Sequence, residues 1–532
     1  MQKIQLYDTT LRDGAQSEGI SFSVEDKLKI ARKMDKLGIH YIEGGWPGSN
    51  PKDIDFFKTA KELSLSHAQI VAFGSTRHAK NNAENDPNIK AMLDAGTSTV
   101  CLVGKTSELH ATQVLETTLE QNLRMIWDSI KYLKSKDYTV FFDAEHFFDG
   151  YKMNAEYSLK CVHMAAEAGA DCVVLCDTNG GSLPQEIAAA TAACQTFDVP
   201  LGIHAHNDGE LAVANSLAAV SAGAVQVQGT INGYGERCGN ANLCSIIPAL
   251  KLKMGMSSIS TKQLARLSDI SHYVSEIANL IPNQYQPYVG ASAFAHKAGL
   301  HVSGIMRNDA SYQHMDPSQV GNASRVLVSE LAGKSNIVYK AKNLGFDLSK
   351  ENDYAKGVLD EIKRLENAGF QYDVAEASFE MLLRRSQEGY KAPFELVDFL
   401  VVVESQRRPP AAGNGGRMLS EAMVKVSVGN ESIHTAAEGD GPVDALDAAL
   451  RKALKTFYPK VADVKLIDYK VRILEESEGT GAPVRVLIES TDGEHFWRTV
   501  GSSTNLIEAS WLSLVDSLEY WLVRKGKIRK TL

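Results

Sequence analysis

The sequence lacks the features of a secreted or membrane-bound protein. No apolar run reaches the ~18 residues that cross a bilayer, and the first residues, MQKIQLYDTTLRDG, do not follow the basic-then-apolar order of a secretory signal. We therefore expect a cytoplasmic protein without a membrane partner.

Cysteine is scarce and confined to one region. All seven cysteines lie between Cys101 and Cys244, and none forms a CxxC pair. A disulfide framework would spread an even number of cysteines along a secreted chain, and a cysteine zinc site needs paired thiolates. We expect reduced cysteines, with Cys172 and Cys176 buried in a strand.

Positive charge is in deficit. Lys and Arg number 56 against 65 Asp and Glu, which gives a net charge of −9 and argues against a nucleic-acid partner. Hydrophobic residues at 44% and charged residues at 23% match ordinary globular proteins, so the chain should fold. A chain of 532 residues provides for roughly three to five domain-sized pieces.

The first half alternates strand-like and helix-like segments. Eight short apolar runs are separated by segments such as VEDKLKIARKMDKLG, whose apolar residues share one helical face. The eight runs are Ile4–Tyr7, Tyr41–Glu43, Ile70–Phe73, Thr99–Val103, Thr139–Phe142, Cys172–Cys176, Gly202–His206 and Val225–Thr230. Eight such units predict an α/β fold, a (β/α)8 TIM barrel. The alternative is an open doubly wound sheet, which would carry a glycine-rich loop where this chain has DTTLRDGAQ.

Polar residues follow the predicted strands. The segments DTTLRDG, DAEHFFDG, DTNGG and HNDGE each come directly after an apolar run. The active site of a TIM barrel forms where its strands end, so these segments predict a polar pocket for a charged ligand.

Two histidines stand two residues apart in the seventh run, LGIHAHN. The two-residue period of a strand places His204 and His206 on one face, which we expect to line the pocket. Asp13 would add a carboxylate and Asn240 an amide oxygen, leaving positions for water or substrate. This set predicts a divalent metal, Zn, Mn, Mg, Co or Fe(II). The two-histidine, one-carboxylate site of non-haem iron oxygenases stays an alternative.

Longer motifs carry a family resemblance over nearly the whole chain. LYDTTLRDGAQ, HAHND, GERCGN and PYVGASAFAHKAGLHVSG closely resemble the acyl-CoA-condensing metalloenzymes that include the 2-isopropylmalate, homocitrate and citramalate synthases. IEGGWPGSNPKD, DAEHFFDGYK, CDTNGG and LVSELAGKSNI look most like the citramalate branch. That likeness implies a Claisen-type condensation of acetyl-CoA, the co-substrate, with pyruvate, and thioester hydrolysis to (R)-citramalate and CoA in isoleucine biosynthesis.

Three other functions stay open. A sister enzyme would use a larger 2-oxo acid and form isopropylmalate or homocitrate. A lyase or aldolase would cleave a carbon–carbon bond on the same barrel, although the long C-terminal tail argues against it. A catalytically silent amino-acid sensor would use the barrel as a scaffold, although the intact Arg12, Asp13 and paired histidines weigh against it.

The resemblance also implies roles for single residues. A metal held by the two histidines, Asp13 and Asn240 would polarise the keto group, while Arg12 would share the stabilisation of negative charge. A structural ion pair is the alternative for Arg12. Thr178 would donate a hydrogen bond to the substrate carboxylate.

The base that takes a proton from the acetyl methyl group is less defined. His301 is the candidate, Tyr312 would assist with the thioester or water, and Glu145 would orient the base, relay the proton or itself be the base. His296 lies in the same segment, and spacing favours neither histidine. Glu145 in a purely structural ion pair is the alternative for that residue.

Substrate choice depends on the pocket walls, because one methylene discriminates by only ~1–3 kcal/mol. We expect Leu102 and Phe73 to be walls. Asp143 departs from the apolar or aromatic wall that the resemblance implies at this position in one part of the citramalate branch, which puts the choice of pyruvate in question.

The second half differs from the first. After a barrel at residues 1–260, residues 261–390 read as a helical connector that carries His301 and Tyr312, and residues 391–532 as two βββα units with RRPPAAGNGGR in a hairpin loop. The tail resembles the dimeric regulatory domain of 2-isopropylmalate synthases, with GDGPVDA and VGSSTNLIEAS in loops near an effector site. This implies a homodimer or higher homo-oligomer with isoleucine as effector. Dimerisation without an effector is the alternative.

Overall fold

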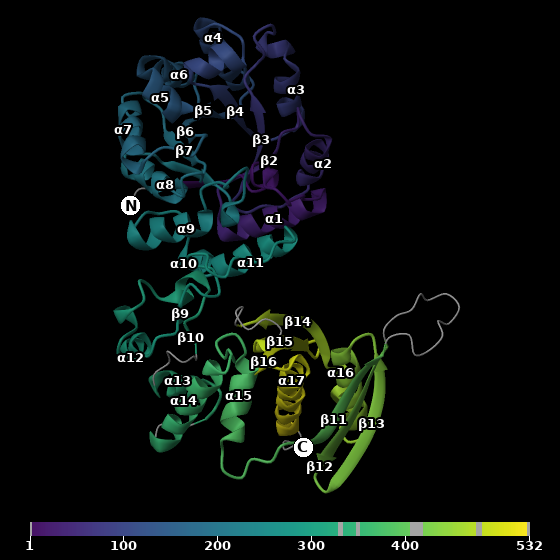
Figure 1. Cartoon of the computed structure of the whole chain (residues 1–532). Coiled ribbons are helices and arrows are strands. Elements are labelled where there is room, and N and C mark those ends of the chain that lie inside the picture. The colour runs from purple at the N-terminus through teal and green to yellow at the C-terminus, as the bar shows by residue number, and fades with distance from the viewer. Residues whose placement is uncertain (1–2, 328–333, 347–351, 405–418, 475–480, 529–532) are drawn as a thin grey trace, which may run out of the picture. The chain divides into compact units, whose positions relative to one another are not determined.

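The computed structural model describes residues 3–327, 334–346, 352–404, 419–474 and 481–528 (Figure 1). Backbone contacts divide the chain into two compact units. One unit holds the chain up to Phe294 together with Met315–Ser324, and the other holds Ala295–His314 and the chain from Arg325 onward. The three-part division at residues 260 and 390 stays a prediction.

The first unit contains a closed barrel of eight parallel strands in chain order. The strands are β1 (Gln5–Asp8), β2 (Tyr41–Gly45), β3 (Gln69–Ser75), β4 (Thr99–Lys105), β5 (Thr139–Glu145), β6 (Cys172–Asp177), β7 (Leu201–Ala205) and β8 (Gln226–Gly229). β1 pairs with both β2 and β8, which closes the barrel. The predicted TIM barrel and all eight of its strands are confirmed, and the open sheet is excluded.

Helices surround this barrel. They are α1 (Val24–Leu37), α2 (Pro51–Ala60), α3 (Pro87–Asp94), α4 (Leu119–Lys134), α5 (Phe147–Met153), α6 (Ala155–Glu167), α7 (Pro184–Cys194), α8 (Ala212–Ser221), α9 (Leu243–Pro248), α10 (Thr261–Leu264) and α11 (Leu267–Ile277). Short 3-10 or π turns lie at Gly14–Gln16, Ala83–Asn85, His110–Val114, Ile231–Gly233, Ala249–Lys253 and Pro317–Val320. The ends of α1 follow from its sequence. Ser23 and Asp26 form a capping box, and Gly38 ends the helix at φ 92°, where glycine has no steric penalty.

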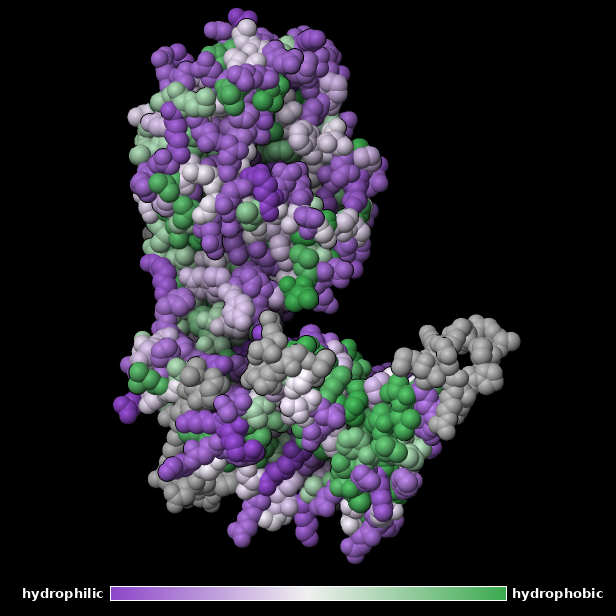
Figure 2. Space-filling view, viewed as in Figure 1, coloured by the Kyte–Doolittle hydropathy of each residue, from purple (hydrophilic) through white to green (hydrophobic). Residues whose placement is uncertain are grey.

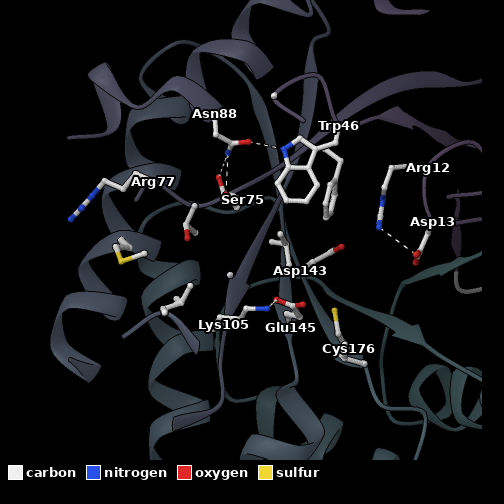
Figure 3. A pocket seen from close by; sticks show the side chains of 18 of the residues that line it. Arg12, Asp13, Trp46, Ser75, Arg77, Asn88, Lys105, Asp143, Glu145 and Cys176 are labelled. Carbon is white, nitrogen blue, oxygen red and sulfur yellow. Dashed lines mark hydrogen bonds and ion pairs between the residues drawn. The ribbon is translucent and has the colours of Figure 1, made fainter. Parts of the chain in front are cut away.

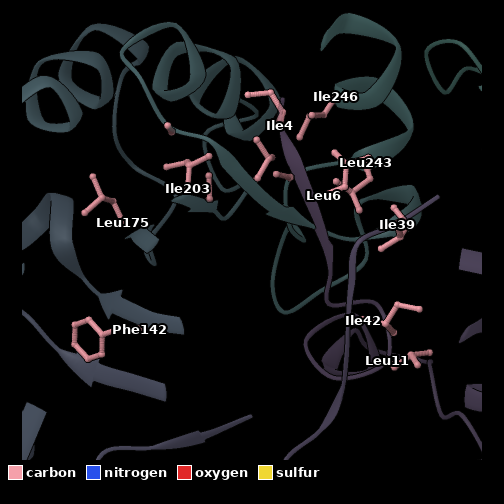
Figure 4. Packing of buried hydrophobic residues seen from close by; sticks show 14 of the residues in the cluster. Ile4, Leu6, Leu11, Ile39, Ile42, Phe142, Leu175, Ile203, Leu243 and Ile246 are labelled. Carbon is pink, nitrogen blue, oxygen red and sulfur yellow. The ribbon is translucent and has the colours of Figure 1, made fainter. Parts of the chain in front are cut away.

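Two apolar layers hold the barrel. The outer layer lies between strands and helices and includes Phe142, Leu175 and Ile203 from the strands (Figure 4). The inner layer lies on the barrel axis and includes Tyr7 and Phe141. Because strand residues alternate between these layers, side chains at the carboxyl ends of the strands that face the axis are free to form a site.

The cysteines belong mostly to these layers. Six of the seven are buried and unpaired, and Cys172 and Cys176 lie in β6 as predicted. Cys238, in the loop after β8, is exposed.

The second unit contains a helical part and two antiparallel sheets. The first part has β9 (Ala295–His296), α12 (Gly299–Arg307), a 3-10 turn (Asp309–Ser311), β10 (Arg325–Val326), α13 (Lys334–Asn343), α14 (Asn352–Asn367) and α15 (Glu376–Arg385). The second has β11 (Glu395–Glu404), β12 (Leu419–Val428), β13 (Glu431–Gly439) and α16 (Pro442–Lys455), then a 3-10 turn (Pro459–Asp463), β14 (Lys465–Ile473), β15 (Val484–Thr491), β16 (Phe496–Ser503) and α17 (Leu506–Ile528).

This order confirms the duplicated βββα pattern, with strand orders β11-β12-β13 and β14-β15-β16. Its apolar core joins both helices to their sheets, and Leu446 and Leu514 are among its buried residues. The segment RRPPAAGNGGR lies outside the described residues. The motif VGSSTNLIEAS is not a loop throughout, because Val500–Ser503 end β16. None of the described helices is long and apolar enough to cross a membrane.

Candidate active site

A polar cavity of about 900 Å³ opens at the carboxyl ends of the barrel strands (Figure 3). Its lining includes Arg12 and Asp13 after β1, Trp46 after β2, Phe73 and Ser75 from β3, Val103 and Lys105 from β4, Asp143 and Glu145 from β5, Cys176 and Thr178 at β6, His204 and His206 at β7, and Arg237 after β8. The segments that sequence analysis placed at the ends of the strands thus meet around one space.

Asp13, His204 and His206 converge in this cavity. Nε2 of His204 lies 3.3 Å from Oδ2 of Asp13, and Nε2 of His206 lies 3.9 Å from the same oxygen. The two Nε2 atoms are 3.3 Å apart, and all three residues are buried. Two imidazole nitrogens and a carboxylate oxygen at these distances form a set that can hold a divalent metal ion.

Asn240 stays the predicted fourth ligand, and its surroundings agree with that role. A backbone bridge pairs it with His206, and its Nδ2 donates to the carbonyl of Tyr234 at 3.2 Å. Its Oδ1 is buried and has no hydrogen-bond partner among the described residues. A buried amide oxygen without a protein donor is suited to a cation, because burial without a partner otherwise costs free energy.

Arg12 lies between the candidate metal site and the interior acid Glu43. Its Nε lies 2.5 Å from Oε1 of Glu43, one terminal nitrogen lies 3.4 Å from Oδ1 of Asp13, and the guanidinium lies 3.9 Å from the ring centre of Phe73. The structural ion pair thus exists, with Glu43 as the partner that sequence analysis missed. Arg12 nevertheless lines the cavity while it forms this ion pair.

The surroundings of Arg12 and Asp13 favour the charged form of both residues. Burial alone lowers the pKa of Arg12, but the carboxylates of Glu43 and Asp13 outweigh burial and hold the pKa above its ordinary value. Burial likewise raises the pKa of Asp13, and Arg12, His204 and His206 outweigh it and hold that pKa below its ordinary range. Both residues therefore stay ionised at any physiological pH.

Glu145 and Thr178 line the cavity on the other side of the barrel. Glu145 forms an ion pair with Lys105, its cross-strand neighbour on β4, which sequence analysis also missed. The Thr178 hydroxyl oxygen accepts a hydrogen bond from the backbone of His146 at 2.8 Å, so its proton remains to be donated to a ligand. The positions agree with the predicted roles, which remain predictions.

His301 and Tyr312 lie in the second unit. Their rings stack with centres 4.3 Å apart, and the ring of His296 lies 6.5 Å from that of His301. Both stacked residues are exposed. His296 is half-buried, and this burial lowers its pKa and so favours its neutral form. The roles of these three residues also stay predictions.

One predicted wall is correct and one is wrong. Phe73 lines the cavity, but Leu102 packs in the outer layer against the helices, and Val103 lines the cavity in its place. Trp46 was missed; it stands edge-on to Phe73 with ring centres 5.3 Å apart, and its indole nitrogen donates to Asn88 at 2.7 Å. The motif IEGGWPGSNPKD, which runs from β2 into the loop after it, was the signal for it.

A polar layer lies on the barrel axis next to the cavity. Glu43, Cys101 and Asp143 bring their polar atoms within 4.8 Å of one another. The carboxylate of Glu43 already accepts hydrogen bonds from Tyr7, Thr9 and Arg12, so we interpret this group as a hydrogen-bonded layer rather than a second metal site. Burial raises the pKa of Asp143 to about 6.

Three family models match the chain in succession. The HMGL-like model matches residues 3–271, the homocitrate synthase post-HMGL domain-like model matches residues 288–369, and the LeuA allosteric (dimerisation) domain model matches residues 373–522. The first covers just over half of the chain and includes every strand of the barrel.

Whole proteins match over the same length. An (R)-citramalate synthase from Geobacter sulfurreducens is 53% identical over 99% of both chains, and one from Aquifex aeolicus is 51% identical over 98% of both. A 2-isopropylmalate synthase from Methanocaldococcus jannaschii is 31% identical over 99% of this chain and 96% of its own. The sequence identity of the chain to these two (R)-citramalate synthases is thus higher than its identity to this 2-isopropylmalate synthase.

Proposed function

Because the chain belongs to the HMGL-like family and, within it, to the (R)-citramalate synthases, we propose that it joins the methyl carbon of acetyl-CoA to the keto carbon of pyruvate. Water then cleaves the thioester, and (R)-citramalate and CoA leave. The observation that carries this proposal is the convergence of Asp13, His204 and His206 beside Arg12. As an acyltransferase in isoleucine biosynthesis, the enzyme would supply the precursor of 2-oxobutyrate.

The residues of the cavity supply positive charge where the keto oxygen gains electrons. A divalent cation, Zn, Mn, Mg or Co, held by Asp13, His204, His206 and Asn240 would act as a Lewis acid on the 2-oxo group. Arg12 adds a second charge that Glu43 and the ring of Phe73 hold in place. Such fixed charge stabilises the transition state more than mobile water does.

The remaining residues handle the pyruvate carboxylate and the protons. The hydroxyl of Thr178 would donate to the carboxylate. His301 would take the proton from the acetyl methyl group, with Tyr312 assisting at the thioester or water, and Glu145 would orient the base or itself accept the proton. Lys105 fixes the carboxylate of Glu145 at the cavity wall.

The test is CoA release from acetyl-CoA with pyruvate, 2-oxobutyrate, 2-oxoisovalerate or 2-oxoglutarate, each with and without a chelator. The protein's own thiol signal is subtracted. Release is expected with pyruvate above all and should fall to background with chelator, because the keto group then loses its Lewis acid. Added metal after chelation is the control and should restore the rate.

Other outcomes would redirect the assignment. Release with only a larger acid would keep the chemistry and move the enzyme to a sister pathway. Metal binding without turnover on any of the four acids would support the sensor function instead.

We also propose that the C-terminal sheets form a homodimer that responds to isoleucine. The matching LeuA domain model is named for dimerisation and allostery. The edge strand β11 carries an apolar patch, visible in green over this sheet in Figure 2. The patch consists of Leu396, Val397, Leu400, Val402 and Val403, which are 37–52% exposed. An apolar edge strand of this kind is suited to a second copy of the same sheet.

Leu400→Glu tests this proposal by placing a charge in the patch. The wild-type chain is expected to sediment as a dimer and to release CoA more slowly with isoleucine, whereas the dimer dissociation constant of the variant should rise at least about tenfold. Ile54→Glu, at an apolar residue of similar exposure on α2, is the control and should stay dimeric. A monomeric wild type would reject the dimer, and an unchanged rate with isoleucine would reject this effector.

A further inference from the structure

We propose that Gln228 and Asp143 are positioning residues for the metal ligand His204. Asp143 orients the side-chain amide of Gln228, and this amide fixes which ring nitrogen of His204 faces the cation. The inference deepens the proposed function and rests on the metal site within it.

Gln228 lies beside His204 on the neighbouring strand. β7 and β8 pair with His204 opposite Gln228, so the two side chains enter the barrel interior together. Oε1 of Gln228 lies 2.9 Å from Nδ1 of His204, and both residues are buried. The contact is therefore shielded from water, and a hydrogen bond is stronger in such a buried environment than in water.

Asp143, on β5, decides which way the amide of Gln228 points. Nε2 of Gln228 donates to Oδ1 of Asp143 at 3.0 Å. A carboxylate only accepts hydrogen bonds, so the reversed amide would place its oxygen against another oxygen. The amide nitrogen therefore faces Asp143, and the amide oxygen faces His204.

This orientation determines the tautomer of His204. Because the amide oxygen can only accept, Nδ1 of His204 has to carry the proton, and the neutral ring then keeps a lone pair on Nε2. Nε2 is the atom that lies 3.3 Å from both Oδ2 of Asp13 and Nε2 of His206. The hydrogen bonds that run from Asp143 through Gln228 to His204, here called the relay, thus point a metal-binding lone pair at the other two ligands. Hydrogen bonds behind a metal ligand orient it in this way in general.

The relay also gives Asp143 a role. This position was expected to be an apolar or aromatic wall, and an acid there is costly because it is buried. An acid that anchors Gln228 keeps both ends of the amide paired, which an apolar side chain would not do. We therefore assign Asp143 to the support of the metal site as well as to the cavity wall.

The same strand offers a matched control. Gln226 lies two residues before Gln228, on the same face of β8, and is equally buried. Its amide nitrogen donates to Gln5 at 3.2 Å, away from His204. Gln226→Leu therefore removes a buried amide from the barrel without touching the relay.

The experiment measures the affinity of the chelator-treated full chain for Co²⁺ by competition with a chromogenic chelator. Gln228→Leu is expected to weaken Co²⁺ binding about 10- to 100-fold, the usual loss when the partner of a metal ligand is removed. Gln226→Leu should bind as wild type. The exchange of Gln228→Glu with Asp143→Asn reverses donor and acceptor, keeps an oxygen facing Nδ1 of His204, and should restore the affinity.

Three results with the variants would overturn the inference. They are wild-type Co²⁺ affinity in Gln228→Leu that still melts cooperatively, an equal loss in Gln226→Leu, or no recovery in the exchanged pair.

The readout also separates this inference from the proposed reaction. Co²⁺ affinity is measured without substrate, so relay-dependent binding without CoA release would reject only the reaction. A wild-type chain that binds no Co²⁺ would overturn both the metal site and the relay.

Discussion

His204→Ala is expected to lose bound metal and to lower the rate of CoA release at least about 10³-fold. The reason is that a Lewis acid stabilises the transition state by several kcal/mol. His204 supplies one of the two nitrogens of the site, and the remaining pair, Asp13 and His206, cannot replace it. Metal content of the purified variant and its steady-state rate with pyruvate are the two measurements.

Two further variants show whether loss of metal is the cause. Glu145→Ala and His301→Ala alter proposed proton-handling residues outside the metal ligands, so both should keep the metal while turnover falls. A difference between them in the exchange of acetyl methyl protons with heavy water would show which one is the base. Retained activity in metal-free His204→Ala would contradict the metal assignment.

The second large effect is expected at Arg12. Removing its charge should lower kcat about 10²- to 10³-fold, the usual loss of one preorganised donor to developing negative charge. Arg12→Met alone would leave the buried Glu43 without its cation, which would lower the free energy of unfolding by about 3–5 kcal/mol. The informative variant is therefore Arg12→Met combined with Glu43→Gln. The amide oxygen can keep the hydrogen bond from one of the hydroxyls of Tyr7 and Thr9, and the amide nitrogen can donate to the oxygen of the other hydroxyl.

Glu43→Gln alone is the matched control for this experiment. It keeps the guanidinium in the cavity and should retain most of the rate. Arg12→Lys keeps a charge without the planar group and is expected to fall between the two. A kcat of the double variant equal to that of Glu43→Gln would show that Arg12 serves only as a structural partner of the interior acid.

The barrel could be predicted because its signal is local and repeated. Each strand is a short apolar run and each helix has one apolar face, so the eight units are visible without any tertiary information. The face of a single residue was harder to predict. In β4 both faces are buried, so the run Val100–Val103 carries no alternation to show that Leu102 faces the helices and Val103 the cavity.

The candidate metal site could be predicted from the sequence for a related reason. His204 and His206 reveal their common face through their spacing alone. Glu43, Lys105 and Gln228 could not be found in this way, because their contacts join different strands. Gln228 and Asp143 stand 85 positions apart in the sequence, and only the closure of the barrel brings them together.

The distribution of thiols makes the folded protein a single-site labelling target. Cys238 is exposed in the loop that also carries Arg237 of the cavity wall, whereas the other cysteines are enclosed by strands and helices. A maleimide dye should therefore attach at one position beside the cavity mouth and report ligand entry by its fluorescence. The same reagent counts the remaining thiols only after the barrel opens, so a time course of labelling also measures the rate of unfolding.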